Sequence, residues 1–157
     1  MRIATLLKRE KYEKGKIVSS RKQQKLRTLQ DIYAAIPQLD CQGKCQRSCG
    51  VIPLFPVEVE LLKDKGIPAP RCSTTEVTCS ALKEGKCSIY ENRPFICRLW
   101  GNVPKMPCLW GCKPNRYLAP QEEKKLLAAM LKLSGGKEPI VNVDTNPLEI
   151  APAHGFR

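Results

Sequence analysis

Cysteine is the residue type in this chain with the clearest chemical potential, because nine of its 157 residues are cysteines. Their thiolates are soft ligands that select Zn²⁺, Cu(I) or iron–sulfur clusters, and a bound cation removes the repulsion between crowded sulfur atoms. Three residues separate each of the first three cysteines, and three separate the last two, so neighbouring thiols can converge on one centre. The nine are Cys41, Cys45, Cys49, Cys72, Cys79, Cys87, Cys97, Cys108 and Cys112.

Disulfide bonding is the alternative use of so many cysteines. The first apolar run, up to Leu7, is too short for the core of a secretory signal. No segment approaches the roughly 18 apolar residues of a membrane span. Complete pairing of an odd number of cysteines in disulfide bonds would also leave one thiol unpaired. We therefore expect a cytoplasmic protein with no membrane contact and with reduced thiols, in which a cysteine pattern indicates metal binding or catalysis more than cross-linking.

The identity of the metal stays open at this level. The single histidine, His154, lies outside the cysteine block, so ligation by cysteine alone is expected. Such ligation suits both a four-cysteine zinc site and a cubane iron–sulfur cluster. The spacing matches neither a zinc ribbon nor a ferredoxin. The sequence predicts zinc or an iron–sulfur cluster in one or two centres, with a minority of the cysteines acting only as buried apolar side chains.

A longer motif occupies the second half of the cysteine block. It includes Cys79 and Leu82, then Gly85-Lys-Cys87-Ser-Ile-Tyr90, and ends with Arg93-Pro94-Phe-Ile-Cys97-Arg98. This motif resembles the signature of the YkgJ-type cysteine-cluster proteins, a family of zinc- or iron-chelating domains. The family pattern runs C-x-x-L, then G-x-C-x-I-Y-x-x-R-P-x-x-C-R. The first half departs from the family's C-x2-C-x2-C-C, since three residues separate Cys41, Cys45 and Cys49.

The resemblance implies which residues surround the metal. Two further cysteines, Cys108 and Cys112, are additional candidates outside the family pattern, as is Cys72 with less expectation of a role. Arg93 and Arg98 would offset the negative charge of the thiolates and donate hydrogen bonds to sulfur, with a surface salt bridge as the alternative. Tyr90 would belong to the core of the small domain or help to exclude water from the metal. The implied ligands are Cys41, Cys45, Cys49, Cys79, Cys87 and Cys97.

The positive charge of the protein is concentrated at its N-terminus. Residues 1–30 contain ten Lys or Arg and two Glu, which gives +8 of the net charge of +12. A basic arm of this kind binds nucleic acid, another polyanion or a protein partner, although a solvated N-terminus has the same composition. The candidate binding residues are Lys8, Arg9, Lys11, Lys14, Lys16, Arg21, Lys22, Lys25 and Arg27.

Helices with clear start and stop signals must position the cysteines. Apolar residues at three- and four-residue steps predict an amphipathic helix over residues 21–36. A leading proline, acidic residues in the first turn and a following glycine predict two more, at 56–65 and 120–133. Pro94 can open a further turn through Leu99, and residues 84–90 suit a turn followed by a strand.

The sequence therefore predicts a small, irregular, mostly α domain stapled by metal, with a basic N-terminal arm and an extended C-terminal tail. The expected parts are the arm with its helix (1–37), the metal-binding domain (38–116), and a helix with the tail (117–157). A structural or adaptor module without catalysis of its own is the leading interpretation. An iron–sulfur redox enzyme component and a component of a larger assembly, docking through arm and tail, are the alternatives.

Overall fold

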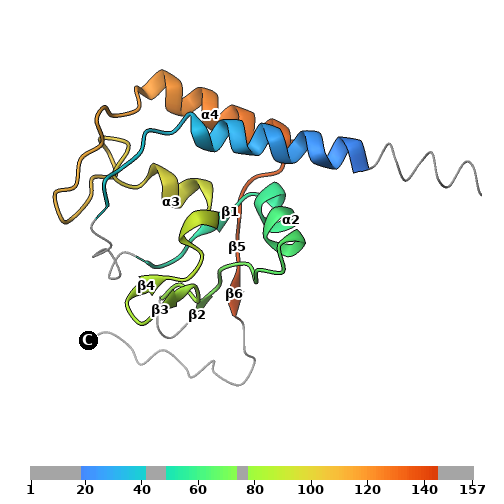
Figure 1. Cartoon of the computed structure of the whole chain (residues 1–157), viewed down its shortest axis with the longest axis horizontal. Coiled ribbons are helices and arrows are strands. Elements are labelled where there is room, and N and C mark those ends of the chain that lie inside the picture. Colours follow the sequence, from blue (N-terminus) through green and yellow to red (C-terminus); the bar gives the residue numbers. More distant parts are fainter. Residues whose placement is uncertain (1–18, 42–48, 74–77, 145–157) are drawn as a thin grey trace, which may run out of the picture.

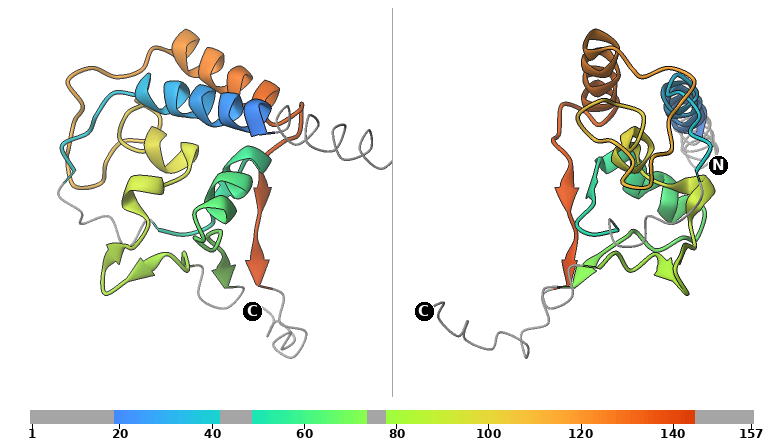
Figure 2. Two further views of the ribbon diagram at one scale, coloured as in Figure 1. Left: turned by 45° about the vertical axis from the view of Figure 1, so that its right-hand side comes forward. Right: turned by 90° about the vertical axis from the view of Figure 1, so that its left-hand side faces the viewer.

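The computed structural model describes residues 19–41, 49–73 and 78–144, and these form a small, mostly helical domain with short strands. Residues 19–34 are helical, and the later helices are α2 (Pro56–Asp64), the short α3 (Phe95–Leu99) and α4 (Pro120–Leu133). A single 3₁₀ turn, η2 (Tyr90–Asn92), precedes α3. The helix of residues 19–34 and α4 lie at one end of the domain, and β2, β3 and β4 lie at the other (Figures 1 and 2). A mostly α fold is confirmed, and so are the four predicted helices.

The two longer labelled helices begin in the same way. Each has a proline at its first position, where the missing N–H costs nothing, and a glutamate at its third. The glutamate side chain turns back to accept a hydrogen bond from the N-cap N–H, 2.9 Å from Phe55 to Glu58 and 2.8 Å from Ala119 to Glu122. α2 ends before Gly66, which has the positive φ of 66° that only glycine adopts easily.

The hydrophobic core lies among the four helices. Phe55 and Phe95 meet edge to face, with ring centroids 6.0 Å apart, and so join the start of α2 to the start of α3. Burial of these side chains is the main driving force holding the helices together. The buried cluster contains Leu29, Ile32, Ile36, Phe55, Val57, Leu61, Phe95, Leu99, Val103, Leu118 and Met130.

Three pairs of two-residue strands complete the described part. β3 (Leu82–Lys83) and β4 (Lys86–Cys87) form an antiparallel hairpin, whose turn places Glu84 and Gly85 at φ 49° and 75°. A two-residue hairpin turn whose twist matches that of the flanking strands requires positive φ at both of its central residues. The predicted turn and strand at 84–90 are therefore present, with β3 as an added partner.

The other two strand pairs involve residues beyond α4. β1 (Pro53–Leu54) is antiparallel to β5 (Ile140–Val141), and β2 (Cys72–Ser73) is parallel to β6 (Val143–Asp144). The first part of the predicted C-terminal tail is thus paired with the domain. Residues 1–18 and 145–157 lie outside the described part, so the basic arm and the remaining tail stay predictions. Among the described helices, none has both the length and the apolar character needed to cross a bilayer.

Candidate metal centre

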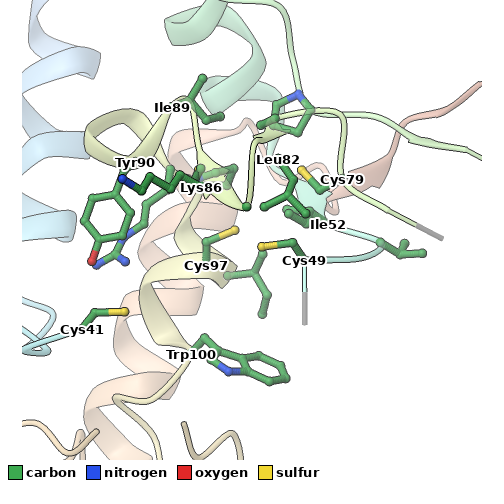
Figure 3. Close-up of a pocket in the computed structure, with 18 of the residues that line it drawn as sticks. Cys41, Cys49, Ile52, Cys79, Leu82, Lys86, Ile89, Tyr90, Cys97 and Trp100 are labelled. Atoms are coloured by element: carbon green, nitrogen blue, oxygen red, sulfur yellow. The ribbon is translucent and has the colours of Figure 1, made fainter. Parts of the chain in front are cut away.

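Six cysteines line a single cavity of about 430 Å³. The remaining wall is mostly apolar and includes Ile52, Leu82, Ile89 and Trp100. Figure 3 shows the sulfur atoms of Cys49 and Cys97 directed into the same space, with Cys79 beside them. The six come from separate segments of the chain and are Cys41, Cys49, Cys79, Cys87, Cys97 and Cys108.

Backbone hydrogen bonds place the cysteines on the hairpin side of the cavity. The N–H of Cys79 donates to the carbonyl oxygen of Cys49 at 2.9 Å, which joins two segments thirty residues apart in sequence. The next turn closes with the N–H of Leu82 on the carbonyl of Cys79, also at 2.9 Å. Leu82 in turn lies opposite Cys87 in the β3–β4 register. Cys49, Cys79 and Cys87 are therefore positioned together by main-chain contacts.

Cys97 reaches the cavity from α3, which has two different faces. Phe95 and Leu99, four residues apart, are buried in the core. Cys97 and Trp100, three residues apart, line the cavity instead. The orientation of α3 consequently decides where the Cys97 thiol lies.

A buried carboxyl group fixes the start of α3. Glu58 is 1% exposed, and its Oε1 accepts hydrogen bonds from the N–H of Phe95 and from the hydroxyl of Tyr33, both at 2.6 Å. Burial raises the pKa of Glu58, whereas the hydrogen bonds from Tyr33, Phe55 and Phe95 lower it. Burial and the neighbouring Glu58 charge also raise the pKa of Tyr33. All three partners are donors, so the group that satisfies them is a carboxylate.

The electrostatics around Cys97 identify its closest thiol neighbours. Burial, together with the charges of Cys79, Cys87, Glu58 and Cys49, raises the pKa of the Cys97 thiol to about 12. Negative sulfurs that repel one another are stabilised by a cation. Cys49, Cys79 and Cys87 are thus the thiols in this cavity whose charges act on Cys97.

The two arginines of the motif secure the segment that leads into α3. Arg98 donates from Nε to the carbonyl of Arg93 at 2.9 Å and from a terminal nitrogen to that of Glu91 at 2.7 Å. Its guanidinium also lies 4.2 Å from the centre of the Tyr33 ring. These contacts position the chain between Cys87 and Cys97, and a direct hydrogen bond from Arg98 to sulfur stays a prediction.

Arg93 and Tyr90 lie against the other end of the cavity. The Arg93 guanidinium stacks 4.2 Å from the centre of the Tyr90 ring. Burial raises the pKa of Tyr90; the Arg93 charge lowers it, and the charge of Cys41 and a hydrogen bond with its side chain raise it. Tyr90 is therefore in hydrogen-bond contact with one of the cavity cysteines.

Two buried N–H donors at the cavity have no acceptor among the described residues, Nε of Arg93 and Nε1 of Trp100. A buried donor without an acceptor costs about 1–3 kcal/mol, so such groups normally have a partner. Both residues line the cavity with the cysteines. Metal-bound thiolates and the sulfides of a cluster are acceptors for N–H donors. The cysteine thiols of the cavity, which can bind a metal, and these two N–H groups, which can donate to its ligands, together fit a thiolate-bound metal group.

Cys108 and Cys112 belong to the loop between α3 and α4. Burial raises the pKa of Cys108, but hydrogen bonds from the backbone N–H groups of Trp110, Cys112 and Gly111 and from the Cys112 side chain lower it overall. Cys108 lines the cavity, whereas Cys112 is not among the residues of its wall. An isolated bridge between Leu39 and Pro114 brings this loop to the segment that ends at Cys41.

Several residues that were predicted for the site lie outside the described part of the chain or away from the cavity. Cys45 and His154 fall outside the described residues, as do Lys8, Arg9, Lys11, Lys14 and Lys16. Cys72 belongs to β2. Of the four basic candidates on the helix of residues 19–34, Lys22 pairs with Asp64 at 2.6 Å and Lys25 with Glu60 at 3.7 Å, while Arg21 and Arg27 are exposed. Within the described ranges, no three His, Cys, Asp or Glu side chains already form a group that could hold a metal ion.

A family model matches the part of the chain that contains this cavity. The model of the CxxCxxCC family, described as "Putative zinc- or iron-chelating domain", matches residues 40–125, more than half of the chain. The chain belongs to the CxxCxxCC family. The match continues past the motif that ends at Arg98 and includes Cys108 and Cys112, so this CxxCxxCC domain is longer than the motif suggested. No curated protein and no solved structure matches the chain.

Two residues that matter for the CxxCxxCC site were not singled out for it from the sequence. From the sequence, Glu58 suits the first turn of the helix predicted at 56–65, and Tyr33 suits the apolar face of the helix predicted over residues 21–36. Their contact spans 25 residues, and that of Glu58 with Phe95 spans 37. The local sequence carries no clear signal, because Glu58 and the exposed Glu60 alternate with valines in the same way.

Proposed function

We propose that this CxxCxxCC protein binds an iron–sulfur cluster in the cysteine-lined cavity and acts as a metal-binding module. The observation that carries the proposal is the convergence of six cysteines on one cavity of about 430 Å³. Cys49, Cys79, Cys87 and Cys97 are the residues that would hold the group. When bound, a cluster would supply one-electron redox chemistry and a cross-link that contributes to folding.

The size and lining of the cavity favour a cluster over a single ion. A water molecule needs roughly 10–15 Å³ of comparable space, and a bare zinc ion is smaller than water. A cluster also presents sulfide atoms that accept hydrogen bonds, which suits the buried N–H groups of Arg93 and Trp100. The mostly apolar wall excludes water, a condition that controls the reduction potential of such centres.

A structural zinc site is the second candidate. It is favoured by the three thiols around Cys97, because together with Cys97 they make the four cysteines that complete a tetrahedral zinc site. A closed zinc site would staple α3 to the hairpin without redox chemistry. The two candidates place the same residues around the metal and differ in what the metal does.

Metal and acid-labile sulfide content of protein purified without oxygen, together with its visible spectrum, distinguishes the candidates. Iron, sulfide in matching amount and a brown colour that bleaches in air support the cluster. Stoichiometric zinc in a colourless protein replaces the cluster with the structural site. Protein that contains neither metal and cannot be reconstituted with either contradicts metal binding altogether.

An adaptor role for the basic N-terminal segment is a separate part of this proposal. It is supported by the +8 charge of residues 1–30 and by the exposure of Arg21 and Arg27. Lys22 and Lys25 already pair with α2, so they contribute less. Fluorescence anisotropy with labelled single- and double-stranded DNA tests the role. Binding that weakens steeply with salt supports contact with a polyanion, and no binding at low salt contradicts it.

A further inference from the structure

The helix α4 has two faces of different composition. On the core side, Met130 is fully buried, and Leu126 packs against the same cluster. On the opposite side, Lys124, Ala128 and Lys132 follow one another at four-residue steps and are all exposed. Residues at such steps lie in one row on the surface of a helix. The solvent side of α4 therefore presents a row of two lysines with a small residue between them.

The acidic residues of α4 do not offset this charge, because both are paired with basic residues from the preceding loop. The carboxylate of Glu122 accepts two hydrogen bonds from the guanidinium of Arg116, at 2.7 and 3.0 Å. The carboxylate of Glu123 pairs with Lys105 at 2.6 Å. A third lysine of the helix, Lys125, is exposed as well. Among the described residues, none forms an ion pair with the three exposed lysines of the helix, which we call the α4 lysine face: Lys124, Lys125 and Lys132.

The α4 lysine face lies beside a second helix with exposed cations. The helix of residues 19–34 packs on the same core cluster as α4, through Leu29, Ile32 and Met130, and it exposes Arg21 and Arg27. Both helices lie at the same end of the domain (Figures 1 and 2). No residue of α4 belongs to the described wall of the cysteine cavity. This end of the domain is therefore free to contact a partner while a metal is bound.

The composition of this face favours phosphate groups over other anionic partners. A helix that binds a membrane surface buries an apolar face among the lipids, but only Leu127 among the large apolar residues of α4 is exposed. Protein–protein interfaces are depleted in lysine and enriched in aromatic residues, and α4 contains no aromatic residue. Lysine contacts are common on the phosphate backbone, and the eight positions from Lys124 to Lys132 cover about 12 Å of helix, beside roughly three to four phosphates of one duplex strand.

We propose that the α4 lysine face binds the phosphate backbone of a nucleic-acid duplex. The inference rests on the adaptor role proposed above and extends it from the basic N-terminal segment to a separate helix. Contacts of this kind hold the duplex without reading its bases, so binding is independent of sequence. The inference does not depend on which metal the cavity holds.

The test uses the full chain and fluorescence anisotropy with labelled DNA and RNA duplexes of the same sequence. Affinity is measured between about 50 mM and about 200 mM salt, because each phosphate contact contributes about 0.9 to the slope of log affinity against log salt. We expect the double variant Lys124→Gln, Lys132→Gln to lower this slope by about 1.8. A fall with either duplex supports the proposal, and comparison of the two shows which nucleic acid is preferred. Glutamine is as good a helix former as lysine, and circular dichroism checks the fold.

A second double variant, Lys63→Gln with Lys83→Gln, is the matched control. Both lysines are exposed, and they belong to α2 and β3. Each double variant lowers the net charge of the protein from +12 by the same two units. The control should therefore keep the wild-type slope if position on α4, and not net charge, decides binding.

Substitutions at Ala128 test the row without removing a lysine. Ala128→Glu places a carboxylate one turn from Lys124 and from Lys132, where it can pair with either. Ala128→Gln adds a side chain of the same size without the charge. We expect the slope of Ala128→Glu to be lower than that of Ala128→Gln by about 0.9, the contribution of one phosphate contact.

The outcomes separate this inference from the adaptor role on which it rests. Duplex binding with the wild-type slope in the Lys124 and Lys132 variant would overturn the inference alone, as would an equal fall in the Lys63 and Lys83 control. No binding of either duplex at low salt would contradict the adaptor role and the inference together. Binding to phosphatidylserine vesicles without binding to either duplex would overturn the inference in favour of a membrane surface.

Discussion

The Glu58 carboxylate accepts a hydrogen bond from the backbone N–H of Phe95 at 2.6 Å, and this bond connects α2 to the first residue of the helix that carries Cys97. The same oxygen accepts from Tyr33, so three separate elements meet at one buried group. α3 has only five residues and cannot be stable on its own. The position of the Cys97 thiol therefore depends on a residue that does not line the cavity.

Replacing Glu58 by Gln tests this dependence. An amide keeps one acceptor oxygen but puts an NH₂ group in place of the other, so at least one of the donors Tyr33, Phe55 and Phe95 loses its acceptor. We expect Glu58→Gln to lower the free energy of unfolding by about 2 kcal/mol, measured by urea denaturation. We also expect weaker metal retention against a chelator, because the hydrogen bond from Phe95 that holds α3 no longer has a charged acceptor.

Glu60→Gln is the matched control for this substitution. Glu60 belongs to the same helix but is exposed, and its pairing with Lys25 at 3.7 Å is a surface contact. Its removal should change stability by less than about 0.5 kcal/mol. Equal losses in the two variants would show that the effect comes from the charge of α2 and not from the contact with Phe95.

Cys97 and Cys79 should be required for metal binding. Cys97 has three thiol neighbours in the cavity, and Cys79 is hydrogen-bonded through its main chain to Cys49. Cys97→Ser and Cys79→Ser should each purify with little metal and should melt at lower temperature by circular dichroism. Cys72→Ser, at the β2–β6 pairing, should retain the metal. Full metal content in both of the first two variants would remove them from the ligand set.

Metal affinity should fall as the pH falls. The pKa of Cys97 is raised to about 12 in the metal-free protein, so this thiol is protonated near neutral pH and must release its proton when a metal binds. Each proton released makes the affinity fall about tenfold per pH unit on acidification. Chelator competition between about pH 6 and about pH 8 measures the slope, and a slope of zero would contradict thiolate ligation.

The raised pKa of Cys97 makes the stability of the metal-free protein depend on pH in the opposite direction. A thiol with a raised pKa binds its proton more tightly when folded than when unfolded. The contribution of Cys97 is therefore fully present below the ordinary thiol pKa of 9.0 and is lost as the pH rises toward about 12. Urea denaturation of metal-free protein should show falling stability over that range, and Cys97→Ser should reduce the fall.

The helices could be predicted because their signals are local. Pro56, Gly66 and Pro120 mark helix ends within a few residues of the turns that they control. The pairing of β1 with β5 depends on residues more than eighty positions apart. Two-residue strands also carry no alternating pattern, so neither their existence nor their partners could be read from the sequence.

For the site, too, only the residues that lie close together in the sequence could be predicted. The motif from Cys79 to Arg98 lies within one stretch of chain, and its cysteines share the cavity. That Cys108 reaches the same cavity depends on the packing of its loop, in which a side chain added at Gly101 would lie 2.6 Å from Leu39 and 3.5 Å from Cys108. Spacing alone could not show that approach, nor that Glu58 holds α3.

Trp100 provides a test of what occupies the cavity. Its indole N–H is buried and has no acceptor among the described residues, although the ring lines the cavity wall. Trp100→Phe removes the N–H and keeps an aromatic ring. If a cluster sulfur accepts this hydrogen bond, the bond stabilises the reduced, more negative state, so its loss should lower the midpoint potential and shift the visible spectrum. Trp110→Phe, at a residue 50% exposed, should change neither property. A Trp100→Phe protein with unchanged spectrum and potential would show that the indole N–H does not contact the metal group.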